Sequence, residues 1–345
     1  MSKIFLSGGS GFLGSNLIKT LLTSPSKYQV ITSVRSEEKG NKLLENLENA
    51  KISTDRISYE IVEDVGGSNS FDETLKKHKD IDVFLHTAAP FHFKSKDVQK
   101  DIINPAVNGL KNALQSVEKY GDNIKRFVLT SSIASAGVAN PKSNKDTKFN
   151  EKTWNEMTEK DAIKNPLLAY YYAKLEPERL LWEYTKNKKP NFAATTVLPA
   201  MIFGPQAFPI GDRKELNTSS EVINKILKLQ SCSKLPPGEG LFIDVRDVCK
   251  SIIDGFEKEN TKDKRLLLYS GSYNTQKILN IIRDNFPEVS LMLPVGKPEN
   301  GDKEDPTIKF WSNEETRKIL GFEFIDLEKS VEDSVEQILE VKNDK

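Results

Sequence analysis

Tyr170 and Lys174 are four residues apart in the run YYYAK, a spacing that places two side chains on one face of a helix. A phenol has a pKa near 10 in water, and a neighbouring ammonium group would favour its ionised form. We predict that the two act together, with Tyr170 protonating the alkoxide formed when a carbonyl is reduced. An amphipathic helix with packed tyrosines and a lysine stem along its surface would carry the same residues.

Hydroxyl groups follow the strand predicted over residues 127–130. Ligands of parallel sheets bind beyond the carboxyl ends of the strands, and Ser131 and Ser132 come directly after this one. Ser132 is predicted to donate a hydrogen bond to the carbonyl oxygen of a substrate. A serine at a strand end can also cap a turn, a role expected for Ser131 more than for Ser132.

A glycine-rich turn joins the first predicted strand, Ile4 to Ser7, to a helix. Glycine allows a tight turn and a close approach of the backbone to a pyrophosphate, whose charge is favourable at a helix N-terminus. A plain turn would also collect glycines, but the first turn of a β-α-β unit favours a dinucleotide site. The residues predicted to bind the cofactor here are Gly8, Gly9, Ser10, Gly11, Phe12, Leu13 and Gly14.

The end of the second predicted strand, residues 30–34, indicates which dinucleotide binds. Enzymes that use NAD generally place an acidic residue there for the ribose 2′-hydroxyl, but this strand continues into Arg35. Arg35 and Lys39 supply cations for a 2′-phosphate, so NADPH is predicted in preference to NADH. Either residue could instead be an ordinary solvated side chain. Asp64 and Val65 are predicted to border the adenine, although an aspartate there is also a common turn former.

Apolar runs of strand length alternate with segments of helical period as far as Pro199. This alternation predicts an α/β fold built on a doubly wound parallel Rossmann sheet. Later prolines and glycines indicate shorter elements. We predict an NADP-binding domain over residues 1–199, to which some later segments return, and a smaller substrate-binding lobe mainly over 200–345. The lysine- and asparagine-rich stretch 140–161 is expected to be a solvated surface excursion.

The charges of the chain balance, with 50 Lys plus Arg and 50 Asp plus Glu. Such a composition provides no positive surplus for nucleic acid or an anionic membrane, so a small-molecule partner is expected. Cys232 and Cys249 form no disulfide or metal-binding pattern, and the start of the chain has no apolar stretch typical of a signal peptide. A cytoplasmic protein without a metal, monomeric or homodimeric, is predicted.

Longer runs of the chain resemble the extended short-chain dehydrogenases/reductases, and within them the dihydroflavonol-reductase-like subgroup. The likeness covers nearly the whole length. The matching runs are VRS at 34–36, HTAAPF at 86–91, PAVNG at 105–109, LTSS at 129–132, FGPQ at 203–206 and DVRDV at 244–248.

This resemblance implies that Ser132, Tyr170 and Lys174 form a catalytic triad. It also implies further contacts to an NADP cofactor, made by Thr87, Ala88, Pro199, Ile202 and Ser219. Ala106 stands where many members of the wider family have an asparagine that takes part in proton relay. The relay is then expected to pass through a ribose hydroxyl, Lys174 and water.

Four uncharged residues close in sequence to the predicted catalytic and cofactor positions predict an apolar substrate pocket: Phe91, Ile133, Leu167 and Met201. Phe91 and Met201 are expected in loops beyond strand ends, whereas Ile133 and Leu167 could be core residues. The resemblance implies reduction of small aliphatic aldehydes, α-dicarbonyls such as methylglyoxal, and aryl ketones. An NAD-dependent sugar epimerase or dehydratase is the first alternative, disfavoured by Arg35. A non-catalytic dinucleotide-sensing regulator is the second, and it would not need the triad.

Overall fold

The computed structural model describes residues 2–88, 95, 97–139 and 148–341 of the chain. It divides into two compact units. Unit 1 comprises Met1–Val138, Glu151–Leu198 and Cys249–Leu267, and unit 2 comprises Ala139–Asn150, Pro199–Val248 and Leu268–Lys345. Within the described ranges, every helix is too short or too polar to cross a lipid bilayer.

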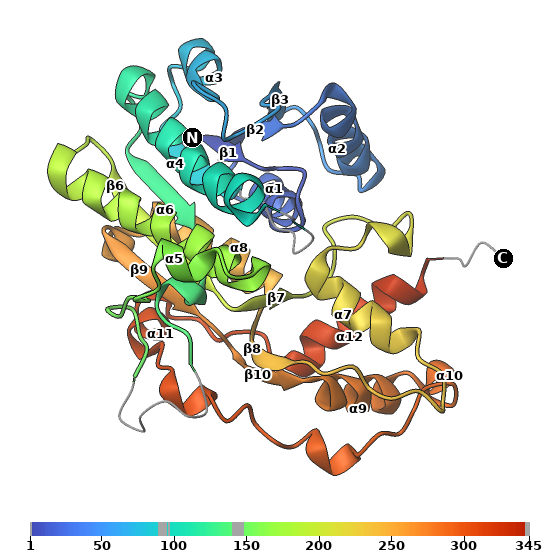
Figure 1. Ribbon diagram of the computed structural model, residues 1–345. Coiled ribbons are helices and arrows are strands. Elements are labelled where there is room, and N and C mark those ends of the chain that lie inside the picture. Colours follow the sequence, from blue (N-terminus) through green and yellow to red (C-terminus); the bar gives the residue numbers. More distant parts are fainter. Residues whose placement is uncertain (1, 89–94, 96, 140–147, 342–345) are drawn as a thin grey trace. The chain divides into compact units, whose positions relative to one another are not determined.

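A seven-stranded sheet runs through unit 1 (Figure 1). In spatial order its strands are β3 (Ile57–Ile61), β2 (Gln29–Val34), β1 (Lys3–Ser7), β4 (Val83–His86), β5 (Arg126–Thr130), β6 (Ala193–Pro199) and β9 (Lys264–Leu268). All neighbours from β3 to β6 pair in parallel. The strand order reverses between β1 and β4, and this switch point is where such sheets bind ligands. The predicted doubly wound α/β class is confirmed.

Helices cover both faces of this sheet, because its strands are apolar on both sides. Side chains of α3 (Asp72–Lys77), α4 (Asn104–Tyr120) and α6 (Pro166–Lys188) share one core with Phe84 and Phe127. Val128 points to the opposite face, where α8 (Val245–Glu257) lies with its Gly255 against the strand. Unit 1 also contains α1 (Phe12–Thr23), α2 (Glu37–Asn49), α5 (Glu159–Ala162), η1 (Gln99–Ile103), η2 (Ile133–Ser135) and η4 (Glu259–Thr261).

The long helix α6 has a clear sequence signal at its start. The Asn165 side chain accepts a hydrogen bond from the Leu168 amide at 3.0 Å, and Pro166 occupies the first helical position. Both features favour a helix start. The helix ends before Lys189, whose φ of 48° is left-handed. Residues 170–178 therefore lie inside the helix, away from both of its ends.

Unit 2 contains a second, three-stranded sheet. Its middle strand β8 (Glu239–Asp244) pairs in parallel with β7 (Met201–Phe203) and antiparallel with β10 (Gly271–Asn274). Its other elements are α7 (Thr218–Leu227), α9 (Thr275–Asn285), α10 (Pro287–Ser290), α11 (Glu314–Leu320), α12 (Leu327–Leu339), η3 (Arg213–Glu215), η5 (Pro298–Asn300) and η6 (Ile308–Phe310). Met201 was expected in a loop, and this is wrong: it begins β7 and packs against the core of unit 2.

The described part of the stretch 140–161 is only partly the solvated excursion that its composition predicts, because some of its residues are exposed and others are buried. Glu151 and Asn155 are each only 8% exposed. The ring of Trp154 lies 3.8 Å from the guanidinium carbon of Arg265, and Asn155 bonds to the backbone of Ala134. A few residues with specific partners thus outweigh the polar average of the segment.

Candidate active site

The glycine-rich turn lies between β1 and α1, at the carboxyl edge of the unit 1 sheet. Gly8 has a φ of +83°, and a Cβ on Gly14 would lie 2.2 Å from the Gly8 carbonyl oxygen; both positions therefore require glycine. The Gly8 amide donates to Ser33 Oγ at 3.2 Å, which ties the turn to β2. Helix α1 has no side-chain cap and no acidic residue in its first turn. Its N-terminal amides suit an anion such as a pyrophosphate.

Two cations lie beyond β2. Arg35 follows the strand, Lys39 lies in the first turn of α2, and both are exposed. Neither forms an ion pair within the part of the chain that the structure describes. Both charges are therefore available to a phosphate group.

Asp64 is exposed, and one of its carboxylate oxygens accepts the Gly66 amide at 2.8 Å. This is the turn-forming contact that was the alternative to an adenine contact. The adjacent Val65 is partly buried. Contact of either residue with adenine stays a prediction.

The end of β4 is held against the end of β1 by Ser7. The amides of Thr87 and Ala88 each donate to Ser7 Oγ at 3.2 Å, and Ser7 Oγ lies 3.0 Å from His86 Nδ1. Ala88 packs so closely on the glycine turn that a Cβ on Gly8 would lie 3.0 Å from its Cα. Sequence reasoning missed Ser7, whose only signal is its place at the end of a strand.

The structure brings Ser132 and Tyr170 together. Their side chains form a hydrogen bond, which joins the end of β5 to α6. Ser132 Oγ also accepts the Ala134 amide at 3.3 Å, so Ser132 caps η2 as well. Burial raises the pKa of Tyr170 to about 12, and the bond with Ser132 offsets only part of this rise. Tyr170 therefore keeps its proton at neutral pH, as a proton donor must.

Lys174 lies one helical turn after Tyr170, and its Nζ is 3.5 Å from the Thr130 carbonyl oxygen. Burial lowers the pKa of Lys174 to about 8. In the protein alone the pKa of Tyr170 is raised, not lowered as a neighbouring ammonium group by itself would predict. Desolvation of the phenol dominates the pKa of Tyr170, because burial disfavours the charged form of any group.

A cavity of about 20 Å³ adjoins Lys174 and is also lined by His86, Ala106 and Thr130. The Thr130 hydroxyl is buried and has no hydrogen-bond partner among the described residues. Burial and the charge of Lys174 lower the pKa of His86 to about 3, so its ring is neutral. A space of this size with polar walls fits about one water molecule.

The residues predicted to form the substrate pocket have different surroundings. Ile133 begins η2 beside Ser132 and is partly exposed. Leu167 lies in the first turn of α6 and is 47% exposed. Phe91 lies outside the described residues, and Met201 belongs to unit 2. The pocket stays a prediction.

Three of the predicted cofactor contacts lie in unit 2 by the division of the chain: Pro199, Ile202 and Ser219. Within that unit, Ser219 Oγ donates to the Ile202 carbonyl oxygen at 2.5 Å. The contact joins the start of α7 to β7. Two distant positions predicted to hold the same ligand are thus neighbours.

Most of the chain matches a single family model, that of the NAD dependent epimerase/dehydratase family, over residues 4–267. The chain is 37% identical to the NADPH-dependent methylglyoxal reductase GRE2 of Saccharomyces cerevisiae, covering 97% of this chain and 98% of that protein. It is 32% identical to the ketoreductase azaE of Aspergillus niger, over 98% of each. The solved structure of yeast methylglyoxal/isovaleraldehyde reductase Gre2 complexed with NADPH has a TM-score of 0.89 and 36% identity, over 98% of each chain.

Proposed function

This chain belongs to the NAD dependent epimerase/dehydratase family, and we propose that it is an NADPH-dependent reductase of small aldehydes and ketones. The observation that carries the proposal is the hydrogen-bonded pair of Ser132 and protonated Tyr170, next to buried Lys174. These groups lie at the sheet edge where ligands of this fold bind. Methylglyoxal and isovaleraldehyde, which name the relatives' activity, define the substrate class.

The residues at this edge fit NADPH. The glycine turn admits a pyrophosphate at the start of α1, and Arg35 with Lys39 offers charge to a 2′-phosphate. When bound, NADPH supplies the hydride that adds to the carbonyl carbon. Two observations disfavour an NAD-dependent sugar epimerase or dehydratase. Arg35 stands where such an enzyme would have an acidic residue, and the relatives are named for the reduction of aldehydes. The intact Ser132, Tyr170 and Lys174 set disfavours a regulator without activity.

In the proposed reaction, Ser132 and Tyr170 both donate hydrogen bonds to the substrate carbonyl oxygen. This polarises the carbonyl and stabilises the negative charge that develops on the oxygen. Tyr170 then gives its proton to that oxygen, and the product is an alcohol. The high pKa of Tyr170 keeps its phenol protonated at the start of each turnover.

Lys174 returns a proton to Tyr170. Its pKa of about 8 suits exchange with water near neutral pH. The cavity beside Lys174 supports a relay through water, since Ala106 leaves the space open and Thr130 offers an unused hydroxyl. A ribose hydroxyl, which bound NADPH would supply, is the remaining member of the path expected from the resemblance.

We place this activity in the cytoplasm, in a monomer or homodimer. The equal numbers of basic and acidic residues and the two free cysteines support a reducing compartment and a small-molecule partner. Apolar side chains near the catalytic group, such as the predicted Ile133 and Leu167, would favour compact aliphatic substrates over charged ones.

The test is consumption of NADPH by the purified protein with methylglyoxal, 3-methylbutanal and an aryl ketone, followed by the loss of its absorbance. We expect turnover, and a reduction in kcat of roughly 100-fold in Ser132→Ala, the usual effect of losing one donor to a developing oxyanion. If no carbonyl compound is reduced, or if a nucleotide sugar is converted without net consumption of the cofactor, the proposal fails.

A further inference from the structure

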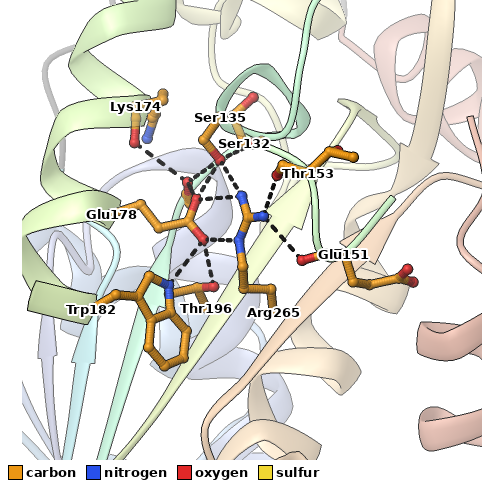
Figure 2. A network of polar contacts seen from close by, with 10 residues as sticks. Ser132, Ser135, Glu151, Thr153, Lys174, Glu178, Trp182, Thr196 and Arg265 are labelled. Atoms are coloured by element: carbon orange, nitrogen blue, oxygen red, sulfur yellow. Dashed lines mark hydrogen bonds and ion pairs between the residues drawn. The ribbon is translucent and has the colours of Figure 1, made fainter. Parts of the chain in front are cut away.

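A fully buried carboxylate lies one helical turn beyond Lys174. Glu178 is on the same face of α6, and its side chain is 0% exposed. Its Oε1 is 2.7 Å from Nε of Arg265 on β9, and the Arg265 side chain is 8% exposed. Figure 2 shows the two side chains facing each other between the sheet and the segment that carries Ser132.

The two oxygens of Glu178 bind different parts of unit 1. Oε2 accepts a hydrogen bond from Ser131 Oγ at 2.6 Å and another from Ser135 Oγ. Oε1 accepts one from Thr196 Oγ1, on β6, at 2.8 Å. One oxygen therefore holds the segment 131–135 on both sides of Ser132, and the other oxygen faces the sheet.

Arg265 extends the network to a third segment. Its Nη1 donates to the Glu151 carbonyl oxygen at 3.0 Å and also to that of Thr153 (Figure 2). Two residues later, the Asn155 amide donates to the Ser135 carbonyl oxygen at 2.9 Å. Contacts thus run in a closed ring from Glu178 through Arg265 and residues 151–155 back to the segment that carries Ser132.

Charge balance keeps this ring intact. Burial by itself would raise the pKa of Glu178, but Arg265 and the serine hydroxyls outweigh burial and hold the pKa below its ordinary value. Glu178 is therefore ionised and accepts hydrogen bonds from every neighbour. A buried ion pair is often no more stabilising than an apolar pair of the same volume. The Glu178–Arg265 pair is therefore better explained by a role in orienting the segment 131–135 than by a gain in stability.

We propose that Glu178, neutralised by Arg265, is a positioning residue that holds the Ser132 hydroxyl against Tyr170. The inference rests on the catalytic role proposed above for Ser132. The side chains of Glu178 and Arg265 bind the 131–135 segment, Thr196 on β6 and the backbone of residues 151–153. They act by fixing the 131–135 segment to the helix that carries the other two catalytic groups.

A matched pair of variants separates positioning from general support. Ser135→Ala removes a hydroxyl from the Oε2 side of Glu178, and Thr196→Val removes one from the Oε1 side. Both hydroxyls are buried, so we expect a similar loss in Tm. Only Ser135→Ala should lower kcat, by about 10- to 100-fold, because a small displacement of a reacting group has a cost of that order. The NADPH dissociation constant, measured by fluorescence titration, should stay within about 2-fold of the wild-type value in both variants.

A double-mutant cycle then asks whether the effect passes through Ser132. If Ser135 acts only by orienting Ser132, adding Ser135→Ala to Ser132→Ala should change the residual kcat by less than about 2-fold. Ser131→Ala repeats the experiment at the second hydroxyl on Oε2 and should behave in the same way.

The outcomes distinguish the inference from the function on which it rests. Wild-type kcat in Ser132→Ala would remove the catalytic role of Ser132 itself. If kcat falls in Ser132→Ala but stays at the wild-type value in both Ser135→Ala and Ser131→Ala, the positioning role of Glu178 is overturned while the catalytic role of Ser132 stands. Independent, multiplying losses in the double variant, or an equal fall of kcat in Thr196→Val, would overturn the positioning role as well.

Discussion

Arg35 and Lys39, which lie beyond β2, are exposed and form no ion pair within the described chain, whereas Tyr170 and Lys174 on α6 have pKa values moved by burial to about 12 and about 8. The region beyond β2 offers positive charge on side chains that no ion pair holds in one orientation within the described chain. The region on α6 offers groups whose protonation is set by their surroundings and whose neighbours hold them in place. Recognition of a phosphate tolerates mobile side chains, but proton transfer requires a donor at a defined position and in a defined state.

The comparison therefore predicts unequal sensitivity. Loss of a group on α6 should abolish a chemical step, because no other side chain has the same place and protonation. Loss of a cation beyond β2 should weaken binding by a limited amount, because exposed charges are screened by water and salt.

The largest effect is expected for Tyr170→Phe, which removes the proton donor and leaves the ring. We expect kcat for aldehyde reduction to fall about 1000-fold, within the range for loss of a general acid. The affinity for NADPH should stay nearly the same, since the lost hydroxyl is proposed to act on the substrate carbonyl and not on the cofactor phosphates. Steady-state kinetics and fluorescence titration measure the two quantities. Tyr171→Phe, one residue on, is the control, and wild-type turnover in Tyr170→Phe would assign the proton to another group.

The second prediction concerns pH and Lys174. Its pKa is lowered to about 8, so the ammonium form is present below that pH and is lost as the pH rises through it. The rate of reduction should accordingly be steady at neutral pH and fall above about pH 8, while Tyr170, with a pKa of about 12, stays protonated there. The measurement is kcat/KM as a function of pH.

Lys174→Arg is the matching variant, because a guanidinium does not lose its proton in this range. We expect a lower rate in this variant but no decline near pH 8. The same alkaline decline in both proteins would show that Lys174 is not the titrating group.

The smallest effects are expected beyond β2. Arg35→Ala should raise KM for NADPH by about 10-fold with kcat nearly unchanged, because the lost contact is to a phosphate that does not react. KM for NADH should hardly change. Lys39→Ala should raise KM for NADPH by only about 2- to 3-fold, again with kcat nearly unchanged, because the contribution of a single exposed charge is small. The difference between NADPH and NADH should shrink as salt is added, and equal use of both cofactors by the unchanged protein would contradict the assignment.

The parts of the site that sequence alone predicts are local ones. The glycine turn, the strand ends and the spacing of Tyr170 and Lys174 all lie within a few residues, so their geometry follows from helix and strand periodicity. The doubly wound parallel class follows as well, because strands that alternate with helices and right-handed connections leave few topologies.

The rest depends on contacts between segments that are distant in sequence. The rise in the Tyr170 pKa in the protein alone was not foreseen, because burial is a property of the folded chain. Glu178 shows a weak signal, an acidic residue four positions after Lys174 on the same helix face. Its partner Arg265 lies 87 residues further on, and no local pattern connects the two. The stretch 140–161 was partly misjudged for the same reason, since its buried residues are defined by their partners.

The late position of Arg265 also bears on synthesis. At ordinary elongation rates, the ribosome adds the 87 residues that separate it from Glu178 in roughly 4 to 17 seconds. Once β6 has been added, the nascent chain contains Ser132, Tyr170, Lys174 and strands β1 to β6, but not yet the guanidinium that neutralises the buried carboxylate or the strand that pairs with β6. A nascent chain of this length exposes an unpaired strand edge, which is a site for aggregation and for chaperone binding. If Glu178 and Arg265 position Ser132 as proposed, the site reaches its active geometry only when β9 leaves the ribosome.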